Sequence, residues 1–362
     1  MVRSWKRHES NNYAMESVGK PRQPSVTAVT DSSQVYEVRR QALKLAAEQN
    51  WDETSAGKLA IVVTEAATNL MKHARQGEIL IGVCQQDGRD GVEVLAFDRG
   101  PGIENIEACL KDGYSNAGTS GAGLGAIARL ADEFDIYSQS GKGTTLVARL
   151  YPPKSGQTGS NGASALQTSA LQIGAVQVPV RGERECGDSW GWRTAGDGMV
   201  VMIADGLGHG PDAAEASRTA VSALASAKDL APAALLERAH RALQHTRGAA
   251  IAIAAIDQKA NQVQFAGVGN ISAVILQPTA TQHLVSHNGT AGHNVRKIQE
   301  FSYGWSPSAA LVMHSDGITT HWRMNTYPGL ARHHPALLAA TLLRDESRGR
   351  DDACVVVVRN AK

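Results

Sequence analysis

The sequence predicts an α+β protein of two domains. Its 362 residues exceed the roughly 150 expected for one domain, and a hydrophobic content of 42% is enough for two cores. Residues 26–151 alternate amphipathic helices with strands, residues 152–169 are rich in Pro, Gly and Ser, and residues 170–362 consist mainly of strands. We therefore expect two domains with these bounds, a tether at 152–169 and a flexible segment at 1–25.

Charge and cysteine content limit the partners and the compartment. The chain has 36 basic and 35 acidic residues, which gives no electrostatic reason to expect nucleic-acid or membrane binding. No apolar run approaches the roughly 18 residues of a membrane span, and the basic first 25 residues lack the apolar core of a secretion signal. The four cysteines form no close pair and no zinc-type spacing. They predict reduced thiols in a cytoplasmic protein.

The first domain begins with a strand and two helices. Residues 26–29 predict a short strand, and Asp31 or Ser32 can cap a helix that runs through residues 35–46. Residues 59–73 predict the central helix, because apolar residues recur there every three or four positions and give it one buried face. These apolar residues are Leu59, Val62, Val63, Ala66, Ala67 and Leu70.

The polar face of this central helix carries side chains suited to chemistry. Glu65, Asn69 and His73 stand four residues apart and form one stripe. In such a stripe, a carboxylate can accept a proton while an amide oxygen helps to hold a magnesium ion on a phosphate tail. The alternative is the solvated polar face of an ordinary amphipathic helix.

A hairpin and a glycine-rich turn follow the central helix. Residues 78–83 and 92–97 predict two antiparallel strands joined by a turn at 86–91. The second strand ends at Asp98, and Gly100 and Gly102 follow on either side of a proline, so the backbone stays close to any ligand of the carboxylate. Asp98 can accept a hydrogen bond from an exocyclic amine such as that of adenine. Alternatively, the motif is only a turn.

A glycine cluster opens the next predicted helix. Its glycines are Gly118, Gly121, Gly123 and Gly125. Leu124, Ile127, Ala128, Ala131 and Phe134 share one face of that helix, so bare amides at its N-terminus could hold a phosphate. The cluster is neither a Walker loop nor a dinucleotide fingerprint, and the alternative is a mobile linker. Residues 141–145, including Thr144, then turn into a last strand at 146–150.

In this order, the motifs resemble the four nucleotide-binding boxes of the GHKL ATPase fold shared by gyrase, heat-shock protein 90 and histidine kinases. The boxes are Glu65-x-x-x-Asn69, Asp98-x-Gly100-x-Gly102, the loop at 118–125 and Gly143-Thr144. Residues 111–115 and 129–134 are especially similar to the switch serine kinase of bacterial stress-signalling complexes. The resemblance covers about residues 25–151. Histidine kinases proper fit less well, because no upstream helix pair carries a phosphoacceptor histidine.

The resemblance implies an ATP-dependent serine kinase domain with a GHKL-type α/β sandwich. It implies that Asn69 holds Mg²⁺, that Asp98 reads adenine, and that the glycine loop closes over the phosphates. It further implies that Glu65 is the general base for a Ser or Thr hydroxyl. The substrate in that family is a small antagonist domain of the STAS type.

The sequence of the second domain predicts strands interrupted by two helices. This pattern suggests sheets covered by helices. The predicted strands are 171–180, 189–193, 199–204, 249–256, 263–267, 272–276, 311–314 and 353–358. The predicted helices are 212–227 and 232–245.

Acidic residues fall at the ends of these strands. They are Asp188, Asp205, Asp316, Asp351 and Asp352. Each alone could be a turn aspartate. Together they offer hard oxygen ligands for Mg²⁺ or Mn²⁺, and no Cys or His spacing indicates zinc. Two such ions about 3.5–4 Å apart can turn a bridging water into a nucleophile for a phosphoester.

Two neighbouring positions refine this metal site. Gly206 would let its backbone carbonyl approach a metal closely. Successive side chains of an extended backbone point to opposite faces, so only one of Asp351 and Asp352 should ligate strongly.

Residues 170–360 resemble metal-dependent Ser/Thr phosphatases of the PPM type, in the bacterial sporulation and stress-response branch (SpoIIE-like), with an α/β/β/α sandwich. The motif Asp205-Gly-x-Gly-His209-Gly carries the resemblance, and Ser315-Asp316-Gly317 with Asp351-Asp352 supports it by order. It implies that Asp205 bridges two metals, that Gly206 contributes its carbonyl, that Asp316 and Asp351 complete one metal, and that Asp188 supports the other. The branch usually shows Gly-Gly-Asp where this chain has Cys186-Gly187-Asp188, and His209 could be structural.

The sequence therefore predicts a bifunctional regulator of stress or sigma-factor partner switching. One domain would phosphorylate Ser or Thr of an antagonist protein with ATP, and the other would hydrolyse such a phosphate. A rival interpretation makes the first domain an anti-sigma binding module for which ATP is only a ligand. A third makes it an ATP-sensing module attached to a phosphatase.

Overall fold

The computed structural model describes residues 18–19, 25–86, 88–111, 123–153, 171–278 and 280–361. Its contacts divide the chain into two compact units. We call the first the N-terminal unit, which comprises Pro21–Thr168 and Tyr327–Arg344, and the second the C-terminal unit, which comprises Met1–Lys20, Ser169–Thr326 and Asp345–Lys362. Among the described helices, none is long and apolar enough to cross a membrane.

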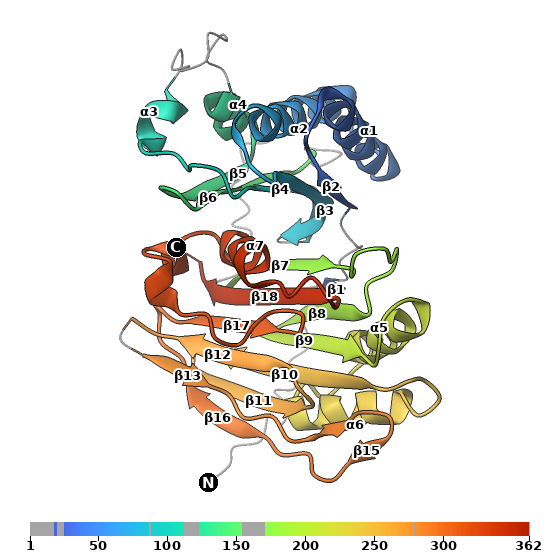
Figure 1. Cartoon of the computed structure of the whole chain (residues 1–362). Helices are drawn as coiled ribbons and strands as arrows, with labels where there is room; N and C mark the ends of the chain where they lie inside the picture. Colours follow the sequence, from blue (N-terminus) through green and yellow to red (C-terminus); the bar gives the residue numbers. More distant parts are fainter. Residues whose placement is uncertain are drawn as a thin grey trace, which may run out of the picture. The chain divides into compact units, whose positions relative to one another are not determined.

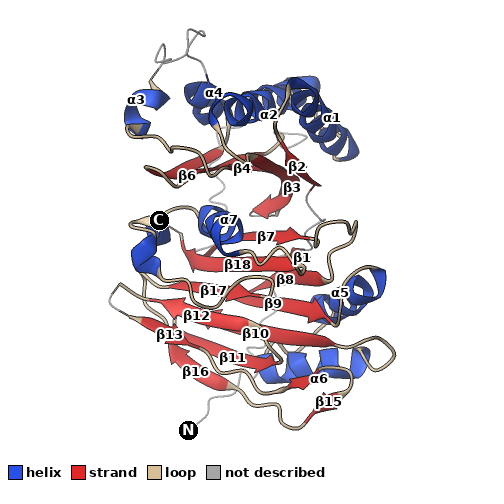
Figure 2. Cartoon of the chain, viewed as in Figure 1, coloured by secondary structure: helices blue, strands red, loops and turns tan. Residues whose placement is uncertain are grey.

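The N-terminal unit contains a five-stranded antiparallel sheet in the order β2-β3-β4-β6-β5 (Figure 1). The strands are β2 (Ser25–Ala28), β3 (Glu78–Gln86), β4 (Arg89–Phe97), β5 (Glu133–Gln139) and β6 (Gly143–Leu150). Helices α1 (Ser32–Glu48), α2 (Glu53–His73) and α4 (Gly123–Leu130) cover one face, and α3 (Ile106–Leu110) lies beside α4 (Figure 2). Buried aliphatic residues of these helices and of β3, β4 and β6 form the core between the two layers.

Local chemistry explains where the first two helices begin. Asp31 accepts a hydrogen bond from Ser33 N, and Gln34 returns one to the Asp31 backbone, which makes a capping box at the start of α1. Asp52 Oδ1 accepts from Ser55 N at 3.0 Å and caps α2 in the same way. Both helices therefore begin where side chains satisfy their first free amides.

One predicted helix ends earlier than its pattern suggested. The apolar pattern from Leu124 to Phe134 predicted a single helix, but α4 ends at Leu130 and Phe134 lies in β5. Asp132 N already donates to Arg149 O of β6, so pairing with the sheet replaces helical hydrogen bonds at this point. A three-and-four spacing continued by chance into the strand.

The second face of the same sheet receives a segment from much later in the chain. Residues 327–344 include the short helix η2 (Leu330–Arg332) and most of α7 (Pro335–Glu346). Their partners Glu133, Asp135 and Thr145 lie one residue away from core residues of β5 and β6, so they point to the face opposite α1, α2 and α4. No element was predicted in this segment from the sequence.

The C-terminal unit is built on two antiparallel sheets. One has the order β1-β8-β9-β10-β11-β16 and the other the order β13-β12-β17-β18-β7. A core of buried residues from both sheets fills the space between them. Helices α5 (Pro211–Ala225) and α6 (Pro232–Ala242) cover the other face of the six-stranded sheet through a second core rich in Ala, Val and Leu. This arrangement and the sheet of the N-terminal unit confirm the predicted fold class.

Most strands of the C-terminal unit extend one or two residues beyond the predicted ones, but the strand predicted at 171–180 ends at Val178 and the one predicted at 272–276 has the predicted bounds. They are β7 (Leu171–Val178), β8 (Asp188–Ala195), β9 (Gly198–Gly206), β10 (Ala249–Asp257), β11 (Gln262–Val268), β12 (Ser272–Leu276), β17 (Ala310–His314) and β18 (Ala353–Asn360). Strands absent from the prediction are β1 (Val18–Gly19), β13 (Thr281–His283), β14 (Gly289–Thr290), β15 (Asn294–Val295) and β16 (Phe301–Gly304). β1 pairs with β8, although residues 1–25 were expected to be flexible.

Candidate functional site

The predicted stripe on α2 faces the start of α4. An alanine at position 123 would place its Cβ 3.3 Å from Asn69 Oδ1 and 3.7 Å from Glu65 Oε2. Gly123, the first residue of α4, therefore lies close to both polar groups. Glu65 and Asn69 are each half-buried, whereas His73 is exposed. The structure therefore brings Glu65, Asn69 and Gly123 together and leaves His73 at the end of the stripe.

Asp98 lies at the end of β4 in a tightly constrained turn. Its Oδ1 accepts a hydrogen bond from Gly100 N at 2.5 Å, and its own N–H donates to Thr144 O at 3.0 Å. Burial raises the pKa of the Asp98 carboxyl, and hydrogen bonds from the backbone oppose that rise. A Cβ on Gly143 would stand 1.9 Å from Asp98 O, so only glycine fits beside this strand end.

The turn after Asp98 is held by the β5–β6 hairpin. Gly102 has φ +77°, a conformation that favours glycine. Ile103 N donates to Ser138 Oγ at 2.7 Å, and that hydroxyl lies 3.0 Å from Thr144 Oγ1. Thr144 therefore supports the turn that follows Asp98.

The glycine cluster is described only in its second half. Gly118 and Gly121 lie outside the described residues. Gly123 begins α4 and Gly125 is buried within its first turn. The start of α4 at Gly123 thus lies close to Glu65 and Asn69.

The five predicted acidic residues of the C-terminal unit interact with one another. Asp188 at the start of β8 stands opposite Asp205 at the end of β9. Burial first, then the charge of Asp205, raises the pKa of Asp188 well above its usual value. Burial and the charges of Asp316 and Asp351 raise the pKa of Asp205 to about 7. Side chains from distant strand ends therefore form one crowded acidic cluster.

Neutral side chains hold two members of this cluster in place. Ser315 Oγ donates to Asp188 Oδ2 at 2.6 Å and accepts from Cys354 N at 2.9 Å. Asn270 Nδ2 donates to Asp316 Oδ2 at 2.7 Å. Sequence reasoning missed Ser315 and Asn270 as positioning groups, although Ser315 directly precedes Asp316.

Asp351 and Asp352 have different surroundings. Asp352 is buried, and its two oxygens accept from Val180 N at 2.7 Å and Gly187 N at 2.8 Å. Asp351 is exposed, and its Oδ1 accepts a hydrogen bond from the neighbouring Asp352 N at 2.9 Å. Asp352 thus holds the loop before Asp188, which leaves Asp351 as the candidate ligand of the pair.

Glycines around the cluster allow close packing of the backbone. A Cβ on Gly206 would lie 2.0 Å from Ala213 O of α5, and one on Gly317 would lie 2.0 Å from Asp352 O. Gly206 is therefore required by the approach of α5, in addition to any role of its carbonyl. His209 is exposed, and its Nδ1 lies 2.8 Å from Glu183 Oε1.

The donor set fits a hard divalent cation. Among the described residues, no group of three or more His, Cys, Asp or Glu side chains is arranged to hold a metal ion as it stands. The cluster nevertheless offers only oxygen donors, and its like charges raise the pKa of Asp188 and Asp205. A divalent cation would neutralise this repulsion, and Mg²⁺ keeps several waters when few carboxylates bind it.

Comparison with family models assigns each part of the chain to a class. Residues 28–150 match the histidine kinase-like ATPase domain, and residues 195–361 match stage II sporulation protein E (SpoIIE). The fold and the two groups of side chains thus define an enzyme that joins a histidine kinase-like ATPase domain to a PPM-type phosphatase domain.

Individual relatives narrow the family. Over 114 residues the chain is 32% identical to serine/threonine-protein kinase RsbT of Bacillus subtilis (strain 168), covering 32% of this chain and 86% of RsbT. Over 149 residues it is 23% identical to phosphoserine phosphatase RsbX of the same organism, covering 41% of this chain and 75% of RsbX. The chain belongs, through its first domain, to the RsbT family of serine/threonine-protein kinases.

About half of the chain is also similar to a solved structure. A protein from work on the bacterial stressosome, a modular system adapted to control secondary messenger signalling, aligns with a TM-score of 0.50 and 27% identity. The alignment covers 52% of this chain and 99% of that protein.

Proposed function

We propose that this protein regulates partner switching by two opposed reactions, phosphorylation of a Ser or Thr with ATP and hydrolysis of a phosphorylated Ser or Thr. The observation that supports the proposal is the presence of both sites in one chain. Glu65 and Asn69 meet the N-terminus of α4 in one unit, and an acidic cluster gathers at strand ends in the other.

In the kinase reaction, each residue of the N-terminal unit has a separate task. Asp98 would accept a hydrogen bond from the adenine amine, and the first amides of α4 would hold phosphate oxygens. Asn69 would ligate Mg²⁺, which neutralises charge on the transferred phosphoryl group. Glu65, half-buried beside Gly123, would take the proton of the attacking Ser or Thr hydroxyl.

In the phosphatase reaction, Asp205 would bridge two ions, with Asp188, Asp316, Asp351 and the Gly206 carbonyl as further ligands. Bound Mn²⁺ or Mg²⁺ would lower the pKa of a shared water and supply a nucleophile near neutral pH. Ser315 and Asn270 hold Asp188 and Asp316 in position through their hydrogen bonds.

The substrate we propose is an antagonist protein with a STAS domain, with a sigma factor or a stressosome as further partner. RsbT is a serine/threonine-protein kinase and RsbX is a phosphoserine phosphatase. This similarity supports a protein phosphorylated on serine or threonine as the type of molecule on which both domains act. We also propose a cytoplasmic location, as the cysteine pattern predicts. All four cysteines lie among the described residues, and none of them forms a disulfide.

The proposal is tested by incubating the full chain with candidate antagonist proteins, ATP and Mg²⁺ or Mn²⁺, and following phosphate by mass spectrometry. Glu65→Ala should abolish phosphorylation and leave dephosphorylation intact. Asp316→Ala should do the reverse. Normal phosphorylation by Glu65→Ala would show that the general base is another residue.

The rival functions of the first domain give different results in the same assay. Stable binding of a sigma factor without phosphotransfer would identify an anti-sigma module. Hydrolysis rates that depend on nucleotide, with no phosphoprotein formed, would identify an ATP-sensing module.

A further inference from the structure

Residues 327–344 bind the sheet of the N-terminal unit at both ends of the segment, although they follow the second domain's Asp316 in sequence. At one end, His334 and its neighbour contact Asp135 and Glu133 of β5. At the other end, Arg344 contacts Asp98 at the end of β4. The segment therefore reaches a residue that we assign to nucleotide binding.

The first anchor fixes the start of α7. His334 N donates to Asp135 Oδ2 at 2.7 Å, and His333 Nδ1 lies 2.9 Å from Asp135 Oδ1. His334 Nδ1 accepts from Ala336 N at 3.1 Å, so the neutral ring carries its proton on Nε2. That nitrogen lies 3.3 Å from Glu133 Oε2.

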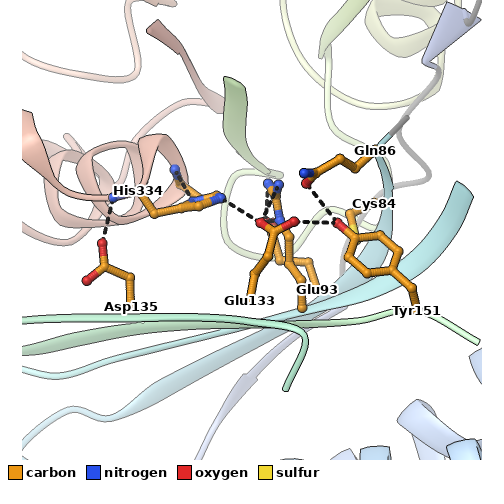
Figure 3. Close-up of polar contacts among 9 residues, drawn as sticks. Cys84, Gln86, Glu93, Glu133, Asp135, Tyr151 and His334 are labelled. Atoms are coloured by element: carbon orange, nitrogen blue, oxygen red, sulfur yellow. Dashed lines mark hydrogen bonds and ion pairs between the residues drawn. The ribbon is translucent and has the colours of Figure 1, made fainter. Parts of the chain in front are cut away.

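A buried ion-pair network extends this anchor across the sheet. Arg149 Nη2 lies 2.7 Å from Glu93 Oε2, and Arg149 Nη1 lies 3.6 Å from Glu133 Oε2. Tyr151 continues the network to Gln86 and Cys84. Figure 3 shows Glu133 between His334 and Tyr151, with Asp135 below the start of the helix. Charged groups that are buried are stable only when they are paired. These ion pairs therefore fix the position of α7 on the sheet.

The second anchor is Arg344, which is only 3% exposed. Its Nη1 donates to Asp98 O at 3.1 Å and to Thr145 Oγ1 at 3.5 Å. Thr341 Oγ1 also donates to Thr145 Oγ1 at 3.2 Å. The backbone carbonyl of Asp98 and the residue beside Thr144 are therefore both held by α7.

We propose that the segment 327–344 completes the nucleotide site and that Arg344 is a positioning residue for Asp98. This inference rests on the proposed function, because it assigns Asp98 to adenine. Asp98 occupies a turn fixed by Gly100, Thr144 and Arg344, and of these partners only Arg344 comes from outside the ATPase domain. Its positive charge also favours the ionised carboxylate that an adenine amine needs as an acceptor.

The test compares ADP with inosine diphosphate, which lacks the exocyclic amine. Calorimetry on the full-length chain with Mg²⁺ measures both affinities for the wild type, Arg344→Met and Arg344→Lys. We expect Arg344→Met to weaken ADP binding about tenfold and to leave inosine diphosphate binding within about twofold, so that the preference for ADP collapses. Arg344→Lys keeps the charge without the planar guanidinium and should lose part of the preference.

Arg332→Met is the matched control, because Arg332 is exposed in the same segment. It should retain the wild-type preference, and thermal melting of each variant reports folding. If Arg344→Met does not fold, Arg344→Lys alone decides the test. Unchanged preference in the folded variants, or equal weakening of both nucleotides, overturns the inference. Failure of the wild type to bind ADP would instead overturn the proposed function.

Discussion

The two candidate sites both depend on carboxylates, but they place them in opposite surroundings. Glu65 lies half-buried on a helix face, near Gly123 and the amide of Asn69. Asp188 and Asp205 are buried among other acids, and their pKa values rise as a result. The first site is a space created by missing side chains, whereas the second is a concentration of like charge.

This difference teaches how each site depends on its ligand. Polar groups that are not crowded need no cation to remain stable, so the stripe on α2 should be tolerant of an empty site. Buried carboxylates of like charge destabilise the fold until a cation offsets their repulsion. Each variant below therefore has one predicted effect on activity and another on stability.

The largest effect is expected from Asp205→Asn. Loss of a bridging ligand should reduce hydrolysis of a phosphoserine peptide to background, by more than about 100-fold, since even outer-shell partners of metals cost 10–100-fold. In EDTA the same variant should melt at a higher temperature than the wild type, because Asn carries no charge that would repel the other buried carboxylates. Asp229→Asn, an exposed aspartate of the same unit, is the control. A lower melting temperature in EDTA would contradict the crowded cluster.

Glu65→Gln should have the next largest effect. We expect phosphorylation to fall by roughly 100-fold or more, because a positioned general base contributes 10²–10⁴-fold. Nucleotide affinity and melting temperature should change little, since Gln occupies nearly the same volume at a half-buried position. Glu53→Gln, exposed in the first turn of α2, is the matched control for charge removal on this helix. A large change in stability would break the contrast with Asp205.

Gly123→Ala should produce a smaller effect on the same site. The new Cβ would stand 3.3 Å from Asn69 Oδ1 and would narrow the space that the first turn of α4 leaves open. We expect ADP affinity to fall about threefold to tenfold, a loss of roughly 1 kcal/mol. Gly57→Ala on α2 meets no atom within 4 Å, so it should keep full affinity and stabilise the helix by about 0.5–1 kcal/mol. Equal effects of both changes would show that helix propensity, not space, is responsible.

Sequence reasoning predicted those parts of the molecule that depend on local patterns. The four-residue spacing of Glu65 and Asn69 placed both on one face of α2, and the strand endings placed Asp188 and Asp205 near each other. The residues that position these groups were harder to predict. Ser315 and Asn270 contact the acidic cluster only because the strands pair. No local spacing in the sequence predicts such a contact.

Helix α7 is the clearest omission. Pro335 and the apolar run after it are signals of a helix start and a buried helix, yet the segment was read as part of a strand-rich region. The packing of α7 on β5 and β6 could not be predicted from the sequence, because Asp135 and His334 are 199 residues apart. Phe134 shows the converse error, in which a helical spacing ran on into a strand.

The smallest expected effect is the pH dependence of stability that arises where α7 packs on the sheet. Burial lowers the pKa of His334, so the folded ring stays neutral while the unfolded ring gains a proton below about pH 6.5. The unfolded state then binds more protons, and stability falls as the pH drops from about 7.5 through 6.5. Burial raises the pKa values of Asp135 and Glu133, but hydrogen bonds and nearby positive charges together lower them below their usual values, so their contribution is lost only at more acidic pH.

His334→Asn isolates this contribution, because Asn can still cap the start of α7 without titrating. Urea unfolding at pH 7.5 and 5.5 should show that the wild type loses up to about 1 kcal/mol more than the variant. His283→Asn, on the exposed strand β13, should behave as the wild type does. Equal losses in the wild type and His334→Asn would mean that His334 is protonated in the folded chain. The helix start would then be held by an ion pair with Glu133, and the second face of this sheet would carry a paired charge where we infer a neutral imidazole.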